Sequence, residues 1–156
     1  MSEQEPEDFA AMINAADDGW VRVMGLVLLK ATKDEVIGEI EVGKHHLQAY
    51  GIVHGGVHAG IIESLASIGA AVNAMAEGRT AVGLENSTSF LRAVRSGKLR
   101  AVARPLAKGR RSHVWEASVH DEQGRLVASG KVRLMILDTG AEVAGERVEM
   151  APPKPA

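Results

Sequence analysis

Two glycines and one glutamate stand at a spacing that suits acyl transfer. The run from Gly51 to Val57 reads GIVHGGV, and Glu63 follows His54 by nine residues. Glycines free a stretch of backbone that a ligand can approach closely. The N–H groups at the start of a helix carry a positive dipole end that suits an anionic oxygen. A carboxylate among apolar residues is costly unless it has a task or a partner, so we infer acyl-transfer chemistry.

The segment after the glycines is apolar on nearly every side. Residues 57–76 read VHAGIIESLASIGAAVNAMA and contain no proline. This predicts a helix over about 57–77, with Gly78 as its C-terminal cap. A helix that is apolar all round is buried, and at this length it spans about 30 Å, so we expect a curved sheet to wrap it. Glu63 interrupts the one candidate for a membrane span.

The other elements predict an α+β fold in one domain. A short helix is expected at residues 9–16. Two strands are expected at residues 20–31 and 36–42, and three or four more after the long helix, at about 80–91, 98–106, 111–120 and 125–137. We expect the domain to cover residues 20–137, after a tail and short helix over 1–19 and before a flexible tail over 138–156.

Composition limits the classes of function. The 156 residues are 46% hydrophobic and 24% charged with a net charge of -2, which fits an ordinary globular domain without general attraction to nucleic acid or membrane. The chain has no cysteine, which excludes disulfides and thiolate metal sites and fits a reducing compartment. The acidic start MSEQEPEDFA lacks the layout of a signal peptide. We therefore expect a cytoplasmic protein.

Several segments together resemble the hotdog-fold acyl-CoA thioesterases. HGG with an acid at the ninth position, AVGLENSTSFLRAV and DEQGRLVAS occur in this order within residues 20–137. They are similar to the phenylacetate-degradation and 4-hydroxybenzoyl-CoA thioesterase group, above all to the glutamate-using branch. The resemblance implies a curved antiparallel sheet around one central helix. It also implies hydrolysis of an acyl-CoA without a further cofactor, with aryl or arylacetyl groups favoured and medium aliphatic chains open.

Five residues are the candidates for catalysis. The resemblance implies that Glu63 is the nucleophile or general base and that Gly55 supplies the oxyanion donor. Gln48 would hydrogen-bond the thioester or the attacking water. Ser67, one turn beyond Glu63, would hold the water, orient the carboxylate or bond back to its own helix. His54 fits an organising side chain at the helix start better than a proton-transfer group.

Coenzyme A recognition is expected on a basic stretch. Residues 86–115 carry eight Lys or Arg and no acidic residue. The candidates for substrate and coenzyme A binding are Gly56, Arg92, Arg110, Arg111 and Ser112. Guanidinium groups at strand ends or turns suit phosphates. Arg92 matches an arginine of the branch, whereas Arg110 and Arg111 stand where the branch has small hydroxyl residues. Aromatics are only 3% of the chain, which disfavours a nucleic-acid module.

The spacing of the candidate residues predicts a site shared between subunits. Eight residues separate Gly55 from Glu63, which is about 12 Å of helix rise, more than a glutamate side chain covers. A second chain with an antiparallel helix would bring the two groups together, as in the family's dimer. We expect a homodimer with shared sites, paired into a tetramer as a dimer of dimers.

Two other classes of function stay open. A hotdog acyl-CoA hydratase or dehydratase also uses a helix N-terminus and an acid, but it normally carries a His within a proline-containing motif, and no proline lies near His54. A non-catalytic acyl-CoA-binding protein would usually need an attached DNA-binding domain, for which residues 1–19 are too short. No metal site is expected, because His54 and His58 have no third ligand nearby.

Overall fold

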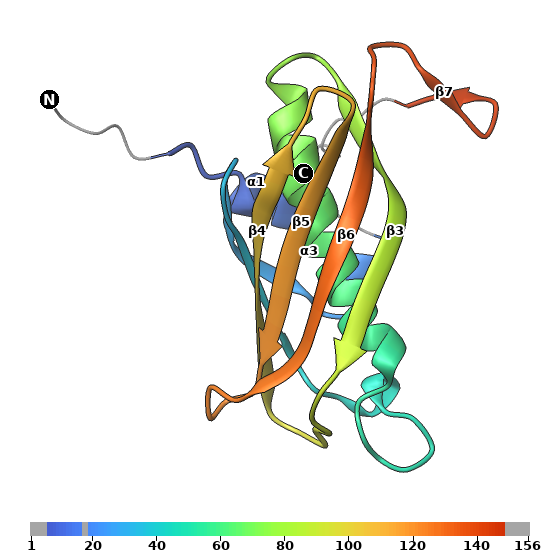
Figure 1. Ribbon diagram of the computed structural model, residues 1–156. Coiled ribbons are helices and arrows are strands. Elements are labelled where there is room, and N and C mark those ends of the chain that lie inside the picture. The colour runs from blue at the N-terminus through green and yellow to red at the C-terminus, as the bar shows by residue number, and fades with distance from the viewer. Residues whose placement is uncertain (1–5, 17–18, 149–156) are drawn as a thin grey trace, which may run out of the picture.

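A six-stranded antiparallel sheet curves around one long helix in the computed structural model (Figure 1). The structure describes residues 6–16 and 19–148. The sheet contains β1 (Val27–Ala31), β2 (Val36–Glu41), β3 (Thr80–Phe90), β4 (Lys98–Lys108), β5 (Ser112–His120) and β6 (Leu126–Leu137). The strand order is β1-β2-β4-β5-β6-β3, with every neighbouring pair antiparallel. This arrangement confirms the predicted α+β hotdog fold.

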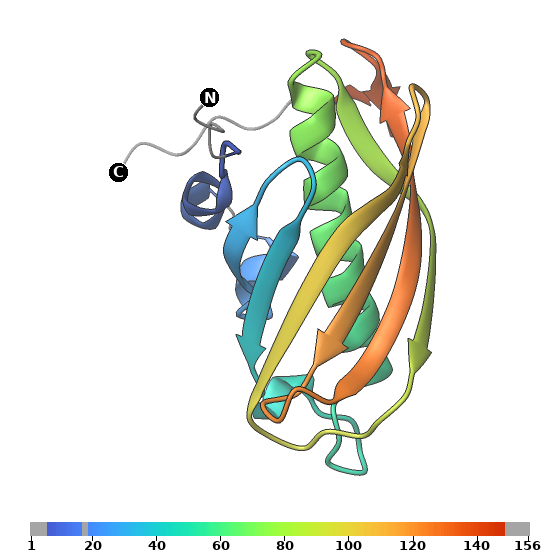
Figure 2. The same ribbon diagram turned by 60° about the vertical axis from the view of Figure 1, so that its left-hand side comes forward.

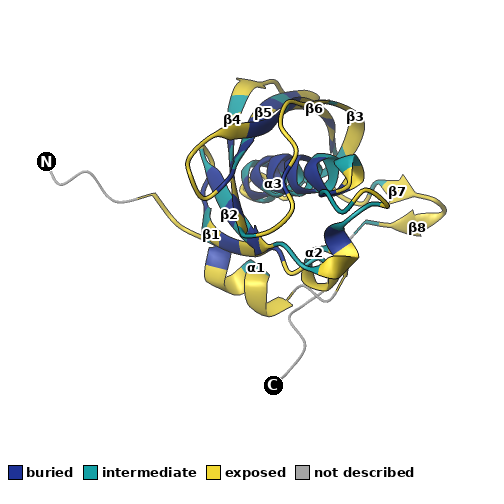
Figure 3. Ribbon diagram, turned by 90° about the horizontal axis from the view of Figure 1, so that it is seen from below, coloured by how far each residue is buried: buried dark blue, intermediate teal, exposed yellow. Residues whose placement is uncertain are grey.

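The central helix α3 (Gly55–Met75) fills the concave side of the sheet (Figures 2 and 3). Ile61, Ile62 and Leu65 on this helix are almost completely buried. By length and composition α3 is apolar enough to cross a membrane, but the sheet packs around one side of it, so it is the buried central helix of the hotdog fold. The helix begins two residues before its predicted start. Gly78 follows its end with a φ of +68°, in the left-handed region that favours glycine.

Two tryptophans lie on glycines of α3. Trp115 on β5 is completely buried, and its ring occupies the space where a side chain at Gly69 would begin. Only glycine therefore lets the helix approach the sheet this closely. Trp20 lies on Gly60 in the same way, although 43% of Trp20 is exposed. Gly60 and Gly69 are nine residues apart, which places them on opposite sides of the helix.

The segment before β1 differs from its prediction. We expected one strand over residues 20–31, but the structure has a short helix, α2 (Trp20–Val23), and β1 begins only at Val27. Gly25, with a φ of +68°, turns the chain between them. The run was misread because a short apolar stretch has the same composition in a buried strand and in a helical turn that packs on a core. The predicted helix at 9–16 is confirmed as α1 (Ala10–Ala16).

The region after β6 also contains more structure than expected. Within the predicted flexible tail, β7 (Glu142–Val143) and β8 (Glu146–Arg147) pair as a small antiparallel hairpin. Gly145 supplies a φ of +83° in its turn. Residues 149–156 of that predicted tail lie outside the described residues.

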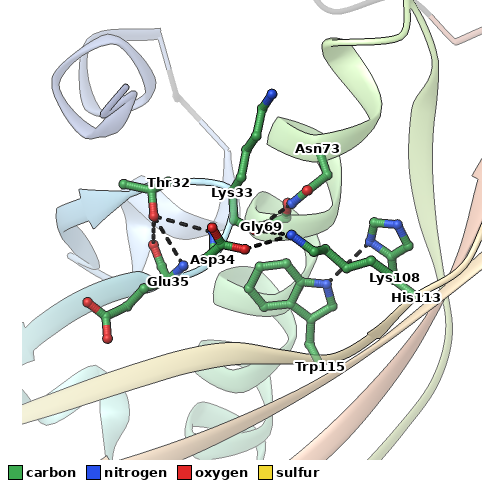
Figure 4. A network of polar contacts seen from close by, with 9 residues as sticks. All are labelled: Thr32, Lys33, Asp34, Glu35, Gly69, Asn73, Lys108, His113 and Trp115. Atoms are coloured by element: carbon green, nitrogen blue, oxygen red, sulfur yellow. Dashed lines mark hydrogen bonds and ion pairs between the residues drawn. The ribbon is translucent and has the colours of Figure 1, made fainter. Parts of the chain in front are cut away.

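A polar network joins α3 to the β1–β2 turn and to β4 (Figure 4). The side-chain amide of Asn73 donates to the carbonyls of Lys33, at 2.7 Å, and Gly69, at 2.8 Å. The Lys108 ammonium lies 2.6 Å from the Asp34 carboxylate. Through the β1–β2 turn, these contacts join the C-terminal half of the helix to β4.

Beside this network, burial keeps His113 in its neutral form. The Trp115 indole N–H donates to Nδ1 of His113 over 3.4 Å, so the ring proton of His113 lies on Nε2. Burial lowers the pKa of His113, and the charge of Lys108 adds to this effect. His113 is therefore uncharged at neutral pH.

Candidate active site

The loop before α3 is held by a buried histidine. The short 3-10 helix η1 (Lys44–His46) ends at His46, whose Nδ1 accepts from the Gly43 N–H at 2.8 Å. Its Nε2 lies 2.8 Å from the Met24 carbonyl, to which it donates. The backbone N–H of His54 donates to the His46 carbonyl, also over 2.8 Å. The start of α3 is thus fixed to the segment that leads into β1.

His54 is the N-cap of α3. Its Nδ1 accepts from the Gly56 N–H at 2.8 Å, and its carbonyl accepts from the Val57 N–H at 2.9 Å. The Gly56 N–H, a candidate binding group, is therefore engaged within the helix start. The Gly55 N–H donates to no described residue. Gly55 thus supplies the unpaired donor at the positive end of the helix.

A cavity of about 330 Å³ opens beside this donor. Gln48, Gly55 and Arg92 all line it, so three candidates from separate parts of the sequence meet there. Phe90 forms an exposed wall, and its ring atoms lie 2.9 Å from the position that a Cβ at Gly55 would occupy. A side chain at position 55 would therefore displace the ring. His58 lines the same cavity, although our reading of the sequence gave it no role in the site.

The Gln48 side chain is oriented by its own loop. Its Oε1 accepts from the Tyr50 N–H at 2.6 Å. The amide NH2 is then the group that a ligand can meet, as a donor. This suits the expected hydrogen bond to a thioester or to a water molecule.

Glu63 faces β3 with both carboxylate oxygens engaged. Its Oε2 accepts from the Asn86 amide at 2.9 Å and its Oε1 from the Ser67 hydroxyl at 3.3 Å. Of the three possibilities for Ser67, the structure has the bond to the carboxylate. Gly83 leaves room for Glu63, because a Cβ there would touch its Oε1. The Thr88 hydroxyl donates to the side-chain Oδ1 of Asn86 at 2.6 Å, which leaves the amide NH2 of Asn86 pointing toward Glu63.

Asn86 and Gly83 had no assigned role in our reading of the sequence. Both lie in the segment AVGLENSTSF. This segment resembles the family, but the sequence alone gave no role to Asn86 or Gly83. The available signal was the alternation of Asn86, Thr88 and Phe90, which places their side chains on one face of a strand. That signal does not identify Glu63 as the partner, because the pairing depends on how β3 packs against α3.

The coenzyme A candidates at the turn from β4 to β5 lie far from the oxyanion donor in one chain. The Arg110 carbonyl accepts from the guanidinium of Arg79 at 2.7 Å, and Arg110 lines a second cavity together with Asn73. Eighteen residues of α3 separate Gly55 from Asn73, about 27 Å of rise. Arg111 and Ser112 follow Arg110 directly in the chain. A single chain therefore brings Arg92, but not this segment, to the first cavity.

Comparisons with known proteins agree with this geometry. The sequence pattern of the thioesterase superfamily matches residues 50–128. Protein Rv1847 of Mycobacterium tuberculosis is 38% identical over 117 residues, which cover 74% of this chain and 84% of that protein. The proofreading thioesterase EntH of Cronobacter sakazakii is 34% identical over 126 residues, covering 80% of this chain and 91% of EntH.

Solved structures show the same architecture. Thioesterase HI1161 of Haemophilus influenzae superimposes with a TM-score of 0.75 at 27% identity, over 83% of this chain and 88% of that chain. The chain therefore belongs to the thioesterase superfamily and is a thioester hydrolase with a hotdog fold.

Proposed function

We propose that this protein hydrolyses acyl-CoA thioesters at sites that two subunits share. Glu63 of one subunit and Gly55 of the other act on the same carbonyl. The main support for the proposal is the distance along one helix between the Gly55 N–H and the Glu63 carboxylate. Gly55 offers an unpaired N–H at the helix start, and Glu63 is held by Asn86 and Ser67 about 12 Å further along.

The edge strand β3 supports the pairing of two chains. It is the last strand in the sheet order, it is eleven residues long, and Leu84 on it is 48% exposed. A long exposed edge presents unpaired N–H and C=O groups to another strand. Pairing β3 with a second β3 across a two-fold axis extends the sheet and sets the two α3 helices antiparallel. Glu63 then approaches the Gly55 N–H of the second chain.

The chemistry follows from these two groups. The Gly55 N–H donates to the thioester carbonyl oxygen. The Glu63 carboxylate attacks the carbonyl carbon, or it takes a proton from a water molecule that attacks. The C=O electron pair moves onto oxygen, where one such donor stabilises it by about 3 kcal/mol. Collapse breaks the C–S bond. In the first route coenzyme A leaves as the thiolate, and water then hydrolyses the acyl-glutamate anhydride, which frees the acid and restores the Glu63 carboxylate. In the second route the thiolate takes the proton that Glu63 removed from water.

Coenzyme A would extend across both subunits. Arg92 lies at the cavity beside Gly55 and suits a phosphate. Antiparallel helices would carry the second chain's Arg110, Arg111 and Ser112 past the start of the first helix, because they lie at the C-terminal end of α3. We further propose that the acyl group is an aryl, arylacetyl or medium-chain group and that the protein belongs to the glutamate-using branch. Two dimers would form a tetramer, and the protein would be cytoplasmic.

A free-thiol assay with a panel of acyl-CoA substrates tests this function. We expect Glu63→Ala to abolish turnover while it folds and binds acyl-CoA. Glu41→Ala, at an exposed glutamate that ends β2, is the matched control and should keep wild-type turnover. Substantial residual activity in Glu63→Ala would contradict the assignment. Binding without thiol release by the wild type would favour the non-catalytic alternative, and hydration of an enoyl-CoA would favour the hydratase.

A further inference from the structure

The sheet has a second edge at β1, which lies at the opposite end of the strand order from β3. An edge strand presents unpaired N–H and C=O groups to another chain. Residues 26–31 of this edge read LVLLKA, apolar except for Lys30 and without proline, a composition that favours pairing between copies of one strand. A chain that paired through both β1 and β3 would join other chains into an open-ended row. The β1 edge therefore needs a cover.

The side chain of Asn14 takes the place of a neighbouring strand. Asn14 belongs to α1, which lies beside β1 (Figures 2 and 3). Its side-chain NH2 donates to the Leu28 carbonyl at 2.8 Å, and its Oδ1 accepts from the Leu28 N–H at 2.9 Å. A residue of an adjacent antiparallel strand would exchange the same two bonds with Leu28. One amide group thus closes this position of the edge.

The chain just before α1 closes a second position, at Ala31. The Asp8 carboxylate accepts from the Ala31 N–H at 2.9 Å, and the Phe9 N–H donates to the Ala31 carbonyl, also at 2.9 Å. The same Asp8 oxygen accepts from the N–H of Ala10, the first residue of α1, at 2.9 Å. Asp8 therefore joins the start of the helix to the end of the strand. The N–H and C=O groups of both Leu28 and Ala31 are thus paired outside the sheet.

This cover is held by few apolar contacts. Within α1 only Ala10 is buried, while Phe9 and Ile13 are partly buried against the core. A helix of seven residues is too short to be stable alone in water, so its conformation depends on its contacts with β1. A segment with few buried contacts opens locally at a lower free energy than the core. It can therefore leave the edge while the sheet stays folded.

We propose that residues 8–14 are an edge cap, a segment that keeps β1 from pairing with β1 of a second copy of this chain. With the edge cap in place, the edge that remains open is β3. When the edge cap opens, the freed backbone groups of Leu28 and Ala31 pair with β1 of another copy, and the exposed side chains of Val27 and Leu29 pack across the new pair. This inference goes beyond the proposed function and needs no acyl-CoA chemistry.

Removal of the polar groups of the edge cap tests the proposal. The double variant Asp8→Ala/Asn14→Ala deletes the side-chain bonds to β1 and keeps the apolar contacts. Size-exclusion chromatography with light scattering should show a mass about twice that of the wild type or higher, and this mass should rise with concentration. Asn14→Ala alone is the milder variant and should show the same rise at higher concentration. Met12→Ala, at an exposed position of the same helix, is the control and should keep the wild-type mass.

Two further measurements show where the copies meet. Hydrogen exchange at the Leu28 and Ala31 amides, in dilute protein, should be about tenfold faster in the double variant. Adding Leu29→Lys to the double variant places a charge on the edge strand and should return the mass to that of the wild type. None of these measurements uses a thioester, so a failure of the proposed function leaves them unchanged.

Three results would overturn the proposal. The first is a wild-type mass at every concentration in both the double variant and Asn14→Ala. The second is a rise in mass that Leu29→Lys does not reverse, because the copies would then meet at another surface. The third is unchanged exchange at both amides, because the edge cap would then not protect the backbone of β1.

Discussion

Removal of the Asn86 amide tests whether β3 prepares the Glu63 carboxylate. The Asn86 NH2 group donates to Glu63 Oε2 at 2.9 Å and to the Ala59 carbonyl at 3.0 Å. A hydrogen bond to a charged group contributes about 1.5–3 kcal/mol, and the exposed position of Asn86 favours the lower end. We therefore expect Asn86→Ala to lower kcat about tenfold, with a smaller change in KM, because the amide contacts the acid and not the coenzyme.

Two related variants give this prediction a graded series. Thr88→Val removes the hydroxyl that orients the Asn86 amide and should lower kcat less than Asn86→Ala does. Asn86→Asp keeps the shape but places a second carboxylate beside Glu63, so we expect a larger loss of kcat from repulsion between like charges.

Steady-state thioesterase assays with one acyl-CoA measure this series, and urea unfolding measures stability in parallel. The bond from Asn86 to Ala59 contributes about 1 kcal/mol, so Asn86→Ala should remain folded at the assay temperature. Wild-type kcat in Asn86→Ala would refute the reasoning, as would equal losses in Thr88→Val and Asn86→Asp. Either result would mean that the carboxylate needs no support from β3.

Three further predictions address the shared site, the coenzyme and pH. Mixing Glu63→Ala chains with chains blocked by Gly55→Val should restore about a quarter of the sites, because half of the randomly formed dimers are mixed and each has one intact site; no recovery after confirmed subunit exchange would count against sharing. Arg92→Ala should raise KM about tenfold for acyl-CoA and leave kcat/KM for an acyl-pantetheine unchanged; equal losses on both substrates would exclude phosphate binding. Burial lowers the pKa of both His58 and His113, so below about pH 6.5 the unfolded chain binds more protons and the folded state loses stability. Urea unfolding at pH 7.5 and 5.5 should show this loss, and a smaller loss in His58→Leu; no difference between the two pH values would contradict it.

Much of the fold could be predicted because the signals are local. The apolar run of α3 and the strand alternation from β2 to β6 depend on near neighbours, and each of these strands begins and ends within two residues of its predicted bounds. α2 was missed because a four-residue helix has no period to read. The hairpin of β7 and β8 was missed because its strands have only two residues each.

The candidate site could be predicted only in part. Spacing identified Gly55 and Glu63 as groups on one helix, and α3 contains both. The support from Asn86 and the space at Gly83 depend on the register between β3 and α3, which no local pattern encodes. His58 was considered only as a metal ligand, because its burial and its unpaired nitrogen exist only after the loop from Gly51 and the end of β3 have packed around it.

The two tryptophans on α3 make the protein its own optical reporter. They are the only tryptophans in the chain, and each lies on a glycine on an opposite side of the same helix. Trp115 is sealed from water and should emit at short wavelength, whereas Trp20 is 43% exposed and should emit further to the red and be quenched by acrylamide. A Trp20→Phe variant isolates the signal from the sheet side of the helix, and a Trp115→Phe variant isolates the signal from the other side. Fluorescence of the unlabelled protein can thus separate two changes. A change at Trp20 reports on the face of α3 that lies away from the sheet, and a change at Trp115 reports that the core has loosened.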